Sequence, residues 1–75
     1  MTYRAALARA QRFGVVEDPR RGKGSERLWI RETVPGARKG PRYSMKCHSE
    51  GMEIPTGTLR AALRRLGIDP KDFFE

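Results

Sequence analysis

The sequence predicts an α+β fold: one domain over residues 1–75, with two helices packed on one face of a three-stranded antiparallel sheet. Three observations lead to this prediction. Apolar residues recur with helical spacing near both ends of the chain, apolar and polar residues alternate in its middle part, and segments rich in proline and glycine separate these stretches. A sheet with one apolar and one basic face is expected to carry its helices on the apolar face.

The first predicted helix begins near Tyr3 and ends before Gly14. Its apolar residues recur every three or four positions, which is the spacing of one helix face. They are Tyr3, Ala6, Leu7, Ala10 and Phe13. Thr2 is placed to cap the start of the helix, and Gly14 is placed to end it.

The first two strands are predicted at residues 15–17 and 26–32. Residues 15–17 form a short β-branched stretch, which ends at the turn sequence DPRRGKGS. Residues 26–32 alternate, and we expect Leu28 and Ile30 to face the core. The opposite, solvent-facing side of this strand then carries Arg27, Trp29 and Arg31.

The third strand is predicted at residues 42–48, after the long basic connection TVPGARKGP. Its core face carries Tyr43, Met45 and Cys47, and its basic face carries Arg42, Ser44, Lys46 and His48. If both apolar sets share the core, the antiparallel pairing places Arg27 opposite His48 and Trp29 opposite Lys46. Glu26 then falls on the core side of the sheet and His48 on the solvent side.

The clearest helix is TGTLRAALRRLG, at residues 56–67. Its apolar face consists of Leu59, Ala62, Leu63 and Leu66. Thr56 or Thr58 can cap its start, and Gly67 closes it. Asp69-Pro70 begins a final short turn that packs Phe73 or Phe74 onto the core. This α-β-β-β-α order is that of double-stranded RNA-binding domains, and we expect a fold of that kind.

The charge of the chain indicates a polyanionic partner. Lys and Arg number 16 against 9 Asp and Glu, which gives a net charge of +7 at pH 7. Nucleic acid, an acidic protein and an anionic membrane surface are the candidate classes. The membrane is the weakest of them, because no apolar run approaches the roughly 18 residues of a spanning helix.

The chain is expected to be cytoplasmic, monomeric when free, and without a cofactor or a metal. Its one cysteine, Cys47, cannot form an intrachain disulfide, and Cys47 with His48 cannot complete a four-ligand zinc site. The sequence GKGS lacks the longer spacing of a nucleotide-binding phosphate loop, so ATP or GTP binding is not expected. Cys47 alternates inward and is read as a small core residue.

Several short motifs together resemble the HicA (YcfA-like) toxin family of type II toxin-antitoxin systems. They are Gly14 after the first helix, GKGSERLW, the strand end Cys47-His48, and IPTGTLRAALRRLGIDPKDFF. The resemblance covers nearly the whole chain and is strongest at residues 56–74. It implies a small mRNA interferase with a fold like that of double-stranded RNA-binding domains. It also implies an acidic, HicB-like antitoxin as partner.

The resemblance places the family's catalytic histidine at Glu26. Members of the family carry a histidine directly after the Gly-Ser of the loop, whereas this chain has Gly24-Ser25-Glu26. Cleavage of RNA by its own 2′-hydroxyl without metal needs a base, an acid and positive groups near the phosphate. Glu26 is the candidate base and His48 the candidate acid. The alternative is that Glu26 is an ordinary residue at a strand edge.

The candidate RNA-binding residues are basic, or lie in the GKGS loop, or stack on bases. They are Lys23, Ser25, Arg27, Trp29, Arg31, Arg42, Lys46, Arg60 and Arg64. Trp29 either stacks on an unpaired base or packs as an edge aromatic on the sheet. Arg60 and Arg64 either contact phosphates or form the solvated face of their helix.

Two functions therefore stay open. The first is a HicA-like toxin that binds mRNA and cleaves it. The second is a non-catalytic RNA-binding or antitoxin-binding relative that has kept the fold and lost the histidine. A small basic DNA-binding protein is a third and weaker interpretation.

Overall fold

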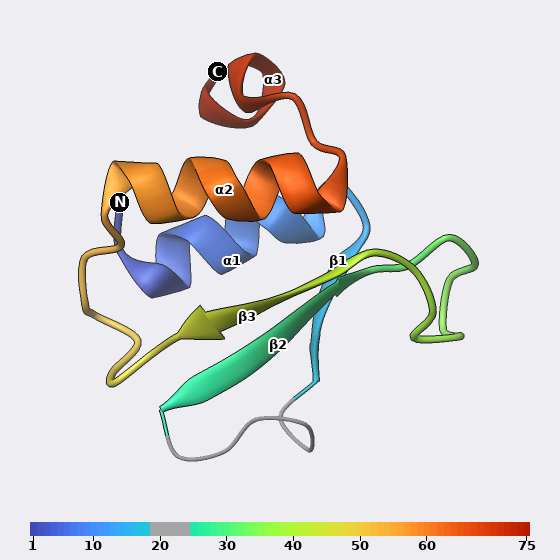
Figure 1. Cartoon of the computed structure of the whole chain (residues 1–75), viewed down its shortest axis with the longest axis horizontal. Coiled ribbons are helices and arrows are strands. Elements are labelled where there is room, and N and C mark those ends of the chain that lie inside the picture. Colours follow the sequence, from blue (N-terminus) through green and yellow to red (C-terminus); the bar gives the residue numbers. More distant parts are fainter. Residues whose placement is uncertain (19–24) are drawn as a thin grey trace.

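The computed structural model describes residues 1–18 and 25–75. Its helices and strands follow the predicted order along the chain (Figure 1). They are α1 (Tyr3–Gln11), β1 (Val15–Asp18), β2 (Glu26–Arg31), β3 (Arg42–Lys46), α2 (Thr56–Leu66) and α3 (Pro70–Phe74). The predicted final turn is the short helix α3. The predicted first helix and third strand are each two residues too long at their C-terminal ends.

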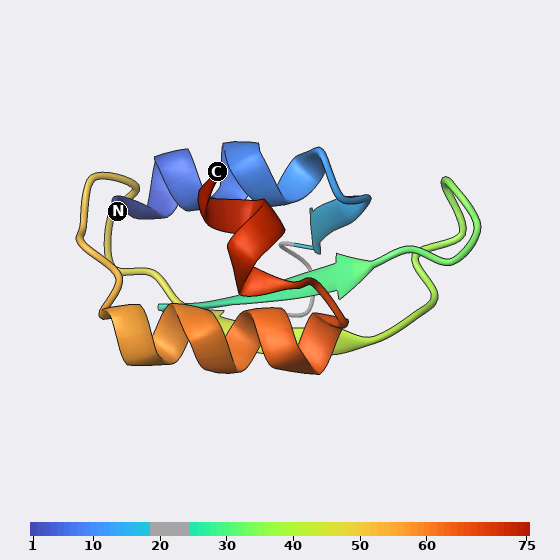
Figure 2. The ribbon, with the colours of Figure 1, turned by 90° about the horizontal axis from the view of Figure 1, so that it is seen from above.

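The described strands form one antiparallel sheet in the order β1-β2-β3. Helices α1 and α2 lie on the same face of this sheet, as expected, and the described part of the chain places no helix on the other face (Figure 1). Figure 2 shows α1 beside β1 and α2 beside β3, so each long helix lies over one edge of the sheet. The prediction of an α+β fold with its helices on one sheet face is confirmed.

The ends of the helices are set mainly by the expected residues. The Thr2 hydroxyl accepts a hydrogen bond from the Ala5 amide at 3.2 Å, and Asp69 accepts one from the Lys71 amide at 2.9 Å. Gly67 ends α2 in the left-handed conformation, with φ of 73°, which glycine adopts at little cost. The predicted capping of α2 by Thr56 or Thr58 is wrong, because the helix starts after Pro55 and no side chain caps it.

The hydrophobic core lies between the sheet and the helices. The leucine face of α2, Ala6 and Ala10 of α1, and Phe73 of α3 are all buried. The sheet contributes Val15, Trp29, Met45 and Cys47. The prediction that Met45 and Cys47 face the core is confirmed, and Tyr43 packs against the core while half-buried.

The predicted orientation of β2 is wrong. Trp29 is fully buried among the core residues, with 0% of its surface exposed, whereas Leu28 and Ile30 lie on the other face of the sheet. A tryptophan has more apolar surface to remove from water than either aliphatic residue, so the core takes the indole. Ile30 is nevertheless buried, because β2 is the central strand and Val16 and Arg42 flank Ile30 on either side.

The predicted register between β2 and β3 is wrong for the same reason. Residues opposite each other in a sheet share a face, so the burial of Trp29 requires a core-facing partner. Trp29 lies opposite Tyr43 rather than Lys46, and Arg27 lies opposite Met45 rather than His48. The inversion also moves Glu26 from the predicted core side to the exposed face, where it lies opposite Lys46.

A chain of polar contacts accompanies the buried indole. The Nε1 atom of Trp29 donates to the Tyr3 hydroxyl at 2.9 Å, and that hydroxyl donates to the Glu17 carboxylate. An Arg27 nitrogen lies 3.4 Å from the same carboxylate. Helix α1, β1 and β2 are therefore joined by hydrogen bonds as well as by apolar contacts, and the indole N–H has the acceptor that a buried donor requires.

We predict that Tyr3→Phe lowers the free energy of unfolding by about 1–3 kcal/mol, because it leaves the buried Trp29 N–H without an acceptor. Denaturant unfolding measures the change. Tyr43→Phe is the matched control, since no described residue hydrogen-bonds to the Tyr43 hydroxyl. Equal stability of the two variants would contradict a structural role for this contact.

Alkaline unfolding provides a second test of Tyr3. Burial and the hydrogen bond to Glu17 raise the pKa of the Tyr3 phenol in the folded state. Above about pH 10 the unfolded chain therefore loses this proton first, so stability falls as the pH rises. We expect the wild-type chain to lose up to about 1.4 kcal/mol per pH unit more than Tyr3→Phe in this range. Parallel pH profiles for the two proteins would contradict the prediction.

Candidate nucleic-acid interface

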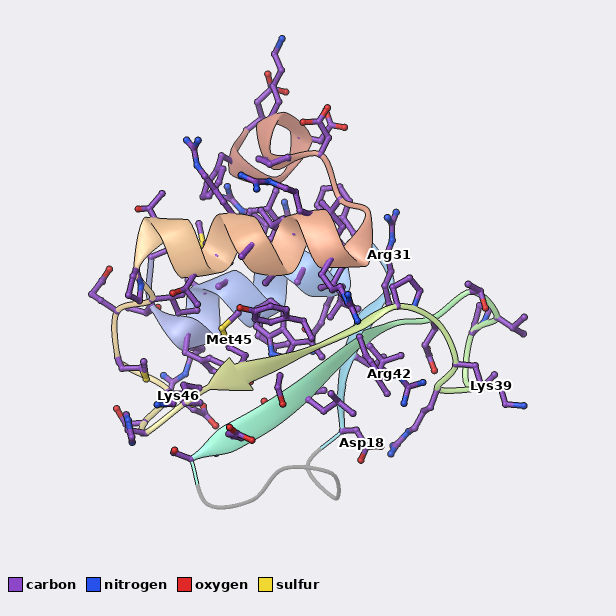
Figure 3. All side chains as sticks on the ribbon, in the orientation of Figure 1. Asp18, Arg31, Lys39, Arg42, Met45 and Lys46 are labelled. Carbon is purple, nitrogen blue, oxygen red and sulfur yellow. The ribbon has the colours of Figure 1, made fainter. Side chains whose placement is uncertain are left out.

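The face of the sheet without helices carries the candidate site. We refer to this surface as the open face, and define it by the outward residues of β2 and β3. They are Glu26, Leu28, Ile30, Arg42, Ser44 and Lys46. Figure 3 shows Arg42 and Asp18 on this side of the sheet and Met45 on the side of the helices. The open face therefore combines a short apolar row at its centre with charged residues around it.

Glu26 and Lys46 form the charged pair at one end of the open face. They lie directly opposite each other on neighbouring strands, and both side chains are exposed. The backbone of the adjacent pair is hydrogen-bonded, with the Cys47 amide donating to the Ser25 carbonyl. Hydrogen-bonded and non-hydrogen-bonded pairs alternate, so Glu26 and Lys46 occupy the closer, non-hydrogen-bonded arrangement. An acidic and a basic residue are thus cross-strand neighbours at the strand end.

His48 lies two residues beyond Lys46, just after the strand. Its side chain is exposed, and it lines a groove beside β3 together with Lys46. Lys46 is thus opposite Glu26 in the sheet and shares the groove beside β3 with His48. The predicted placement of Glu26 on the core side of the sheet is wrong, because Glu26 lies opposite Lys46 on the open face.

Three candidate RNA-binding residues of β2 lie on the helical side of the sheet. Trp29 is buried and cannot stack on a base. Arg27 is half-buried beside Glu17. Arg31 donates to the carbonyls of Phe13, Leu66 and Gly67 at 3.0, 3.2 and 2.7 Å. The guanidinium of Arg31 thus binds the C-terminal end of α2, where unpaired carbonyls and the helix dipole favour a cation.

The other candidates lie on different parts of the surface. Arg42 and Lys46 are exposed on the open face, as predicted. Arg60 and Arg64 are exposed on α2, away from its buried leucines, and so belong to the helical layer. Ser25 is half-buried next to β2, and Lys23 lies outside the described residues. The described basic candidates thus form two separate surfaces instead of one.

Arg38 is a basic residue of the sheet region that sequence reasoning missed. It lies in the connection between β2 and β3, and its guanidinium is 3.4 Å from the Asp18 carboxylate. The same connection is ordered by Glu32, whose carboxylate accepts hydrogen bonds from the amides of Gly36 and Arg38 at 3.2 and 2.8 Å. A glutamate just before a Pro-Gly turn was the available sequence signal for this loop.

The thiol of Cys47 is not a candidate nucleophile. It is 3% exposed, and burial raises its pKa above that of a free cysteine. A thiol must ionise to react, so this environment suits a core residue. The prediction that Cys47 packs inward is confirmed.

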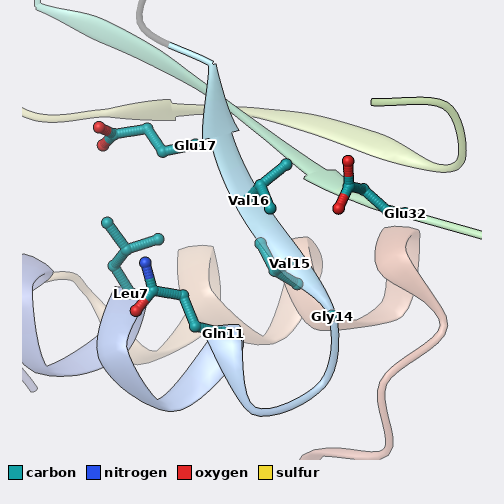
Figure 4. Close-up of a pocket in the computed structure, with 7 residues that line it drawn as sticks. All are labelled: Leu7, Gln11, Gly14, Val15, Val16, Glu17 and Glu32. Carbon is teal, nitrogen blue, oxygen red and sulfur yellow. The ribbon is translucent and has the colours of Figure 1, made fainter. Parts of the chain in front are cut away.

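The two outer edges of the sheet differ in charge. A shallow groove beside β1 is lined by apolar and polar residues of α1 and β1, with the carboxylates of Glu17 and Glu32 on its walls (Figure 4). The groove beside β3 has basic residues, Lys46 and His48, around an apolar floor. Among the described residues, no cluster of three or more His, Cys, Asp or Glu side chains could hold a metal ion.

The chain matches no protein-family model, and no curated protein or solved structure is significantly similar to it. Within the described residues, no helix is long and apolar enough to cross a membrane.

We predict that Arg31→Lys destabilises the fold by about 1–2 kcal/mol, although it keeps the charge. One ammonium group cannot replace a guanidinium that reaches three carbonyls. Arg42→Lys, on the open face, is the matched control and should change stability by less than about 0.5 kcal/mol. Thermal unfolding of both variants measures the difference, and a neutral Arg31→Lys would show that these contacts do not hold α2 in place.

Proposed function

We propose that this chain is a HicA-like toxin component that binds RNA through the open face of its sheet and cleaves it there without a metal. The observation that carries the proposal is the placement of Glu26 directly opposite Lys46, with Arg42 on the same face. This arrangement puts a carboxylate base opposite the ammonium group of Lys46, which can hold a phosphate, and places Arg42 four residues away along β3, where it can hold a neighbouring phosphate.

The element order supports a relation to double-stranded RNA-binding domains. In the described chain, one long helix precedes a three-stranded antiparallel sheet, the second long helix follows it, and both lie on one sheet face. This is the arrangement expected from the resemblance to the HicA family. An acidic antitoxin of the HicB type is the partner that this proposal requires.

The proposed chemistry assigns one role to each group at the strand end. Glu26 takes the proton of the 2′-hydroxyl, Lys46 stabilises the negative charge that develops on the phosphate, and His48 donates a proton to the leaving oxygen. Arg42, at the other end of β3, holds a neighbouring phosphate of the RNA. Attack of the 2′-oxygen forms a bond to phosphorus while the bond to the 5′-oxygen breaks. The products are a 2′,3′-cyclic phosphate and a 5′-hydroxyl.

The burial of Trp29 also bears on how RNA is bound. Without an exposed aromatic on the described open face, stacking of unpaired bases has no platform there. Binding then depends on phosphate contacts from Arg42 and Lys46, which are sensitive to salt and indifferent to base sequence. The proposal therefore expects broad substrate specificity.

The second candidate is a non-catalytic RNA-binding or antitoxin-binding relative. It is favoured by Glu26 itself, because a carboxyl group stands where the HicA family carries its catalytic histidine, and the chain contains a single histidine elsewhere. The two candidates share the interface and differ only in cleavage.

We predict that Glu26→Gln lowers the rate of RNA cleavage by about 10²–10⁴-fold, since it removes the base but keeps the shape of the side chain. RNA binding should be retained, because the substitution removes a negative charge. Glu75→Gln at the C-terminus is the control for loss of a carboxylate. Cleavage of a labelled RNA in the presence of a chelator gives the rate.

Glu26→His separates the two candidates. This substitution restores the Gly-Ser-His of the HicA family, and histidine can exchange protons near neutral pH. Faster cleavage by Glu26→His than by an already active wild type supports the toxin. Cleavage by Glu26→His alone supports the non-catalytic relative, and cleavage by neither protein contradicts the assignment of the site.

A further inference from the structure

The outer edge of β3 presents backbone groups in a regular pattern. In the described part of the chain, β3 pairs only with β2. The Arg31 amide donates to the Pro41 carbonyl at 2.9 Å, so the odd-numbered positions of β3 bond to β2. By the alternation of an antiparallel ladder, the N–H and C=O groups of Arg42, Ser44 and Lys46 point away from β2. This free edge offers three donors and three acceptors to another strand.

A groove lies next to this edge. It has a volume of about 340 Å³ and runs between β3 and the start of α2. Its apolar lining consists of Tyr43, Met45, Met52, Ile54 and Pro55. Side chains of a strand point alternately to the two faces of its sheet. A strand added to β3 would therefore place every second side chain in this groove and the others over the open face.

The charges around the edge select the kind of strand. Arg42 and Lys46 are exposed on the open face next to the edge, and His48 lies at its end. Added side chains on the open face would therefore meet cations. The opposite edge of the sheet differs, because the described residues that line the groove beside β1 include Glu17 and Glu32 and no basic residue that could attract an acidic segment (Figure 4).

We propose that the free edge of β3 binds an extended acidic segment of a partner protein, which joins the sheet as an additional strand. The segment alternates apolar residues, which enter the groove, with acidic residues, which face Arg42 and Lys46. Main-chain hydrogen bonds hold the strand, and the alternating pattern gives specificity. The main-chain contacts use backbone groups that RNA binding does not need, so peptide binding can be measured without RNA, although the acidic side chains would use the same two cations as RNA phosphates.

Direct binding of a defined peptide tests the proposal. The probe is a fluorescein-labelled peptide of alternating glutamate and valine, about six residues long, which is the usual length of a strand. Fluorescence anisotropy with the full chain measures its affinity. A peptide of alternating lysine and valine is the charge control. A glutamate-valine peptide with alternate amides N-methylated, in both registers, is the control for main-chain pairing.

Ser44→Pro is the decisive variant. The Ser44 amide points away from β2, so proline removes a donor of the free edge without removing a bond of the sheet, a position where edge strands accept proline. We expect it to weaken binding of the glutamate-valine peptide by about tenfold or more, while Ser44→Ala binds like the wild type. Circular dichroism confirms that the variants fold. N-methylation of the peptide should weaken binding similarly, and it leaves the protein unchanged.

Four results would overturn the proposal: no binding of the glutamate-valine peptide, equal binding of the lysine-valine peptide, unchanged affinity of Ser44→Pro in its folded form, or unchanged affinity of the N-methylated peptides. The failure of RNA binding is separately visible, because a labelled RNA is titrated with the wild-type chain in an experiment of its own, without the peptide. If Ser44→Pro instead loses RNA and keeps the peptide, the edge serves nucleic acid and the proposal is wrong.

Discussion

The buried indole of Trp29 is the constraint on which the arrangement of this sheet depends. A side chain of this size fits only between the sheet and the helices, and its N–H needs an acceptor there. The Tyr3 hydroxyl supplies that acceptor and passes the contact on to Glu17. Because the side chains of a strand alternate between the two faces of its sheet, the position of the indole on the helical face determines the face of each remaining residue of β2. Glu26 therefore joins the exposed surface as a consequence of packing at Trp29.

The same constraint explains the use of two arginines. Arg27 and Arg31 share the helical face with Trp29, one on each side of it along β2. An arginine tolerates such a position when its guanidinium finds acceptors, and these two find the Glu17 carboxylate and the carbonyls at the end of α2. Part of the positive charge thus stabilises the fold. The net charge therefore overstates the number of cationic side chains that are available to bind a polyanion.

The sequence was sufficient for the elements but not for the orientation of β2. Helix periodicity, Thr2, Gly67 and the Asp69-Pro70 turn act locally, so they can be recognised in a single chain. Either Trp29 or the pair Leu28 and Ile30 could face the core. Both alternatives are apolar, so the sequence pattern does not decide between them. Only the packing of α1 against the sheet, through Tyr3, decides between them. Because paired residues share a face of the sheet, assigning the wrong face to β2 also gives the wrong pairing between β2 and β3.

The candidate site was predictable in the same uneven way. Lys46 and Arg42 were assigned correctly to the exposed face, because β3 alternates cleanly. The pairing of Glu26 with Lys46 could not be predicted without the correct register between β2 and β3. The conformation of the loop between β2 and β3 depends on contacts between residues that are distant in sequence. One of these is a close approach: a Cβ at Gly40 would lie 2.0 Å from the Arg31 carbonyl oxygen, so only glycine fits there. Glu32 and the Arg38–Asp18 pair complete the loop.

Arg42 and Lys46 connect the two proposed interactions. Their side chains lie on the open face, where RNA phosphates are proposed to bind, and their backbone groups belong to the free edge of β3. The main chain of an added strand would lie along the edge of the sheet, whereas its acidic side chains would compete with phosphates for the same two cations on the open face. Binding at the edge would then weaken binding on the face through charge, and the effect would diminish as salt screens the cations. The geometry of one short strand would thus be enough to couple an acidic partner to the polyanion it displaces.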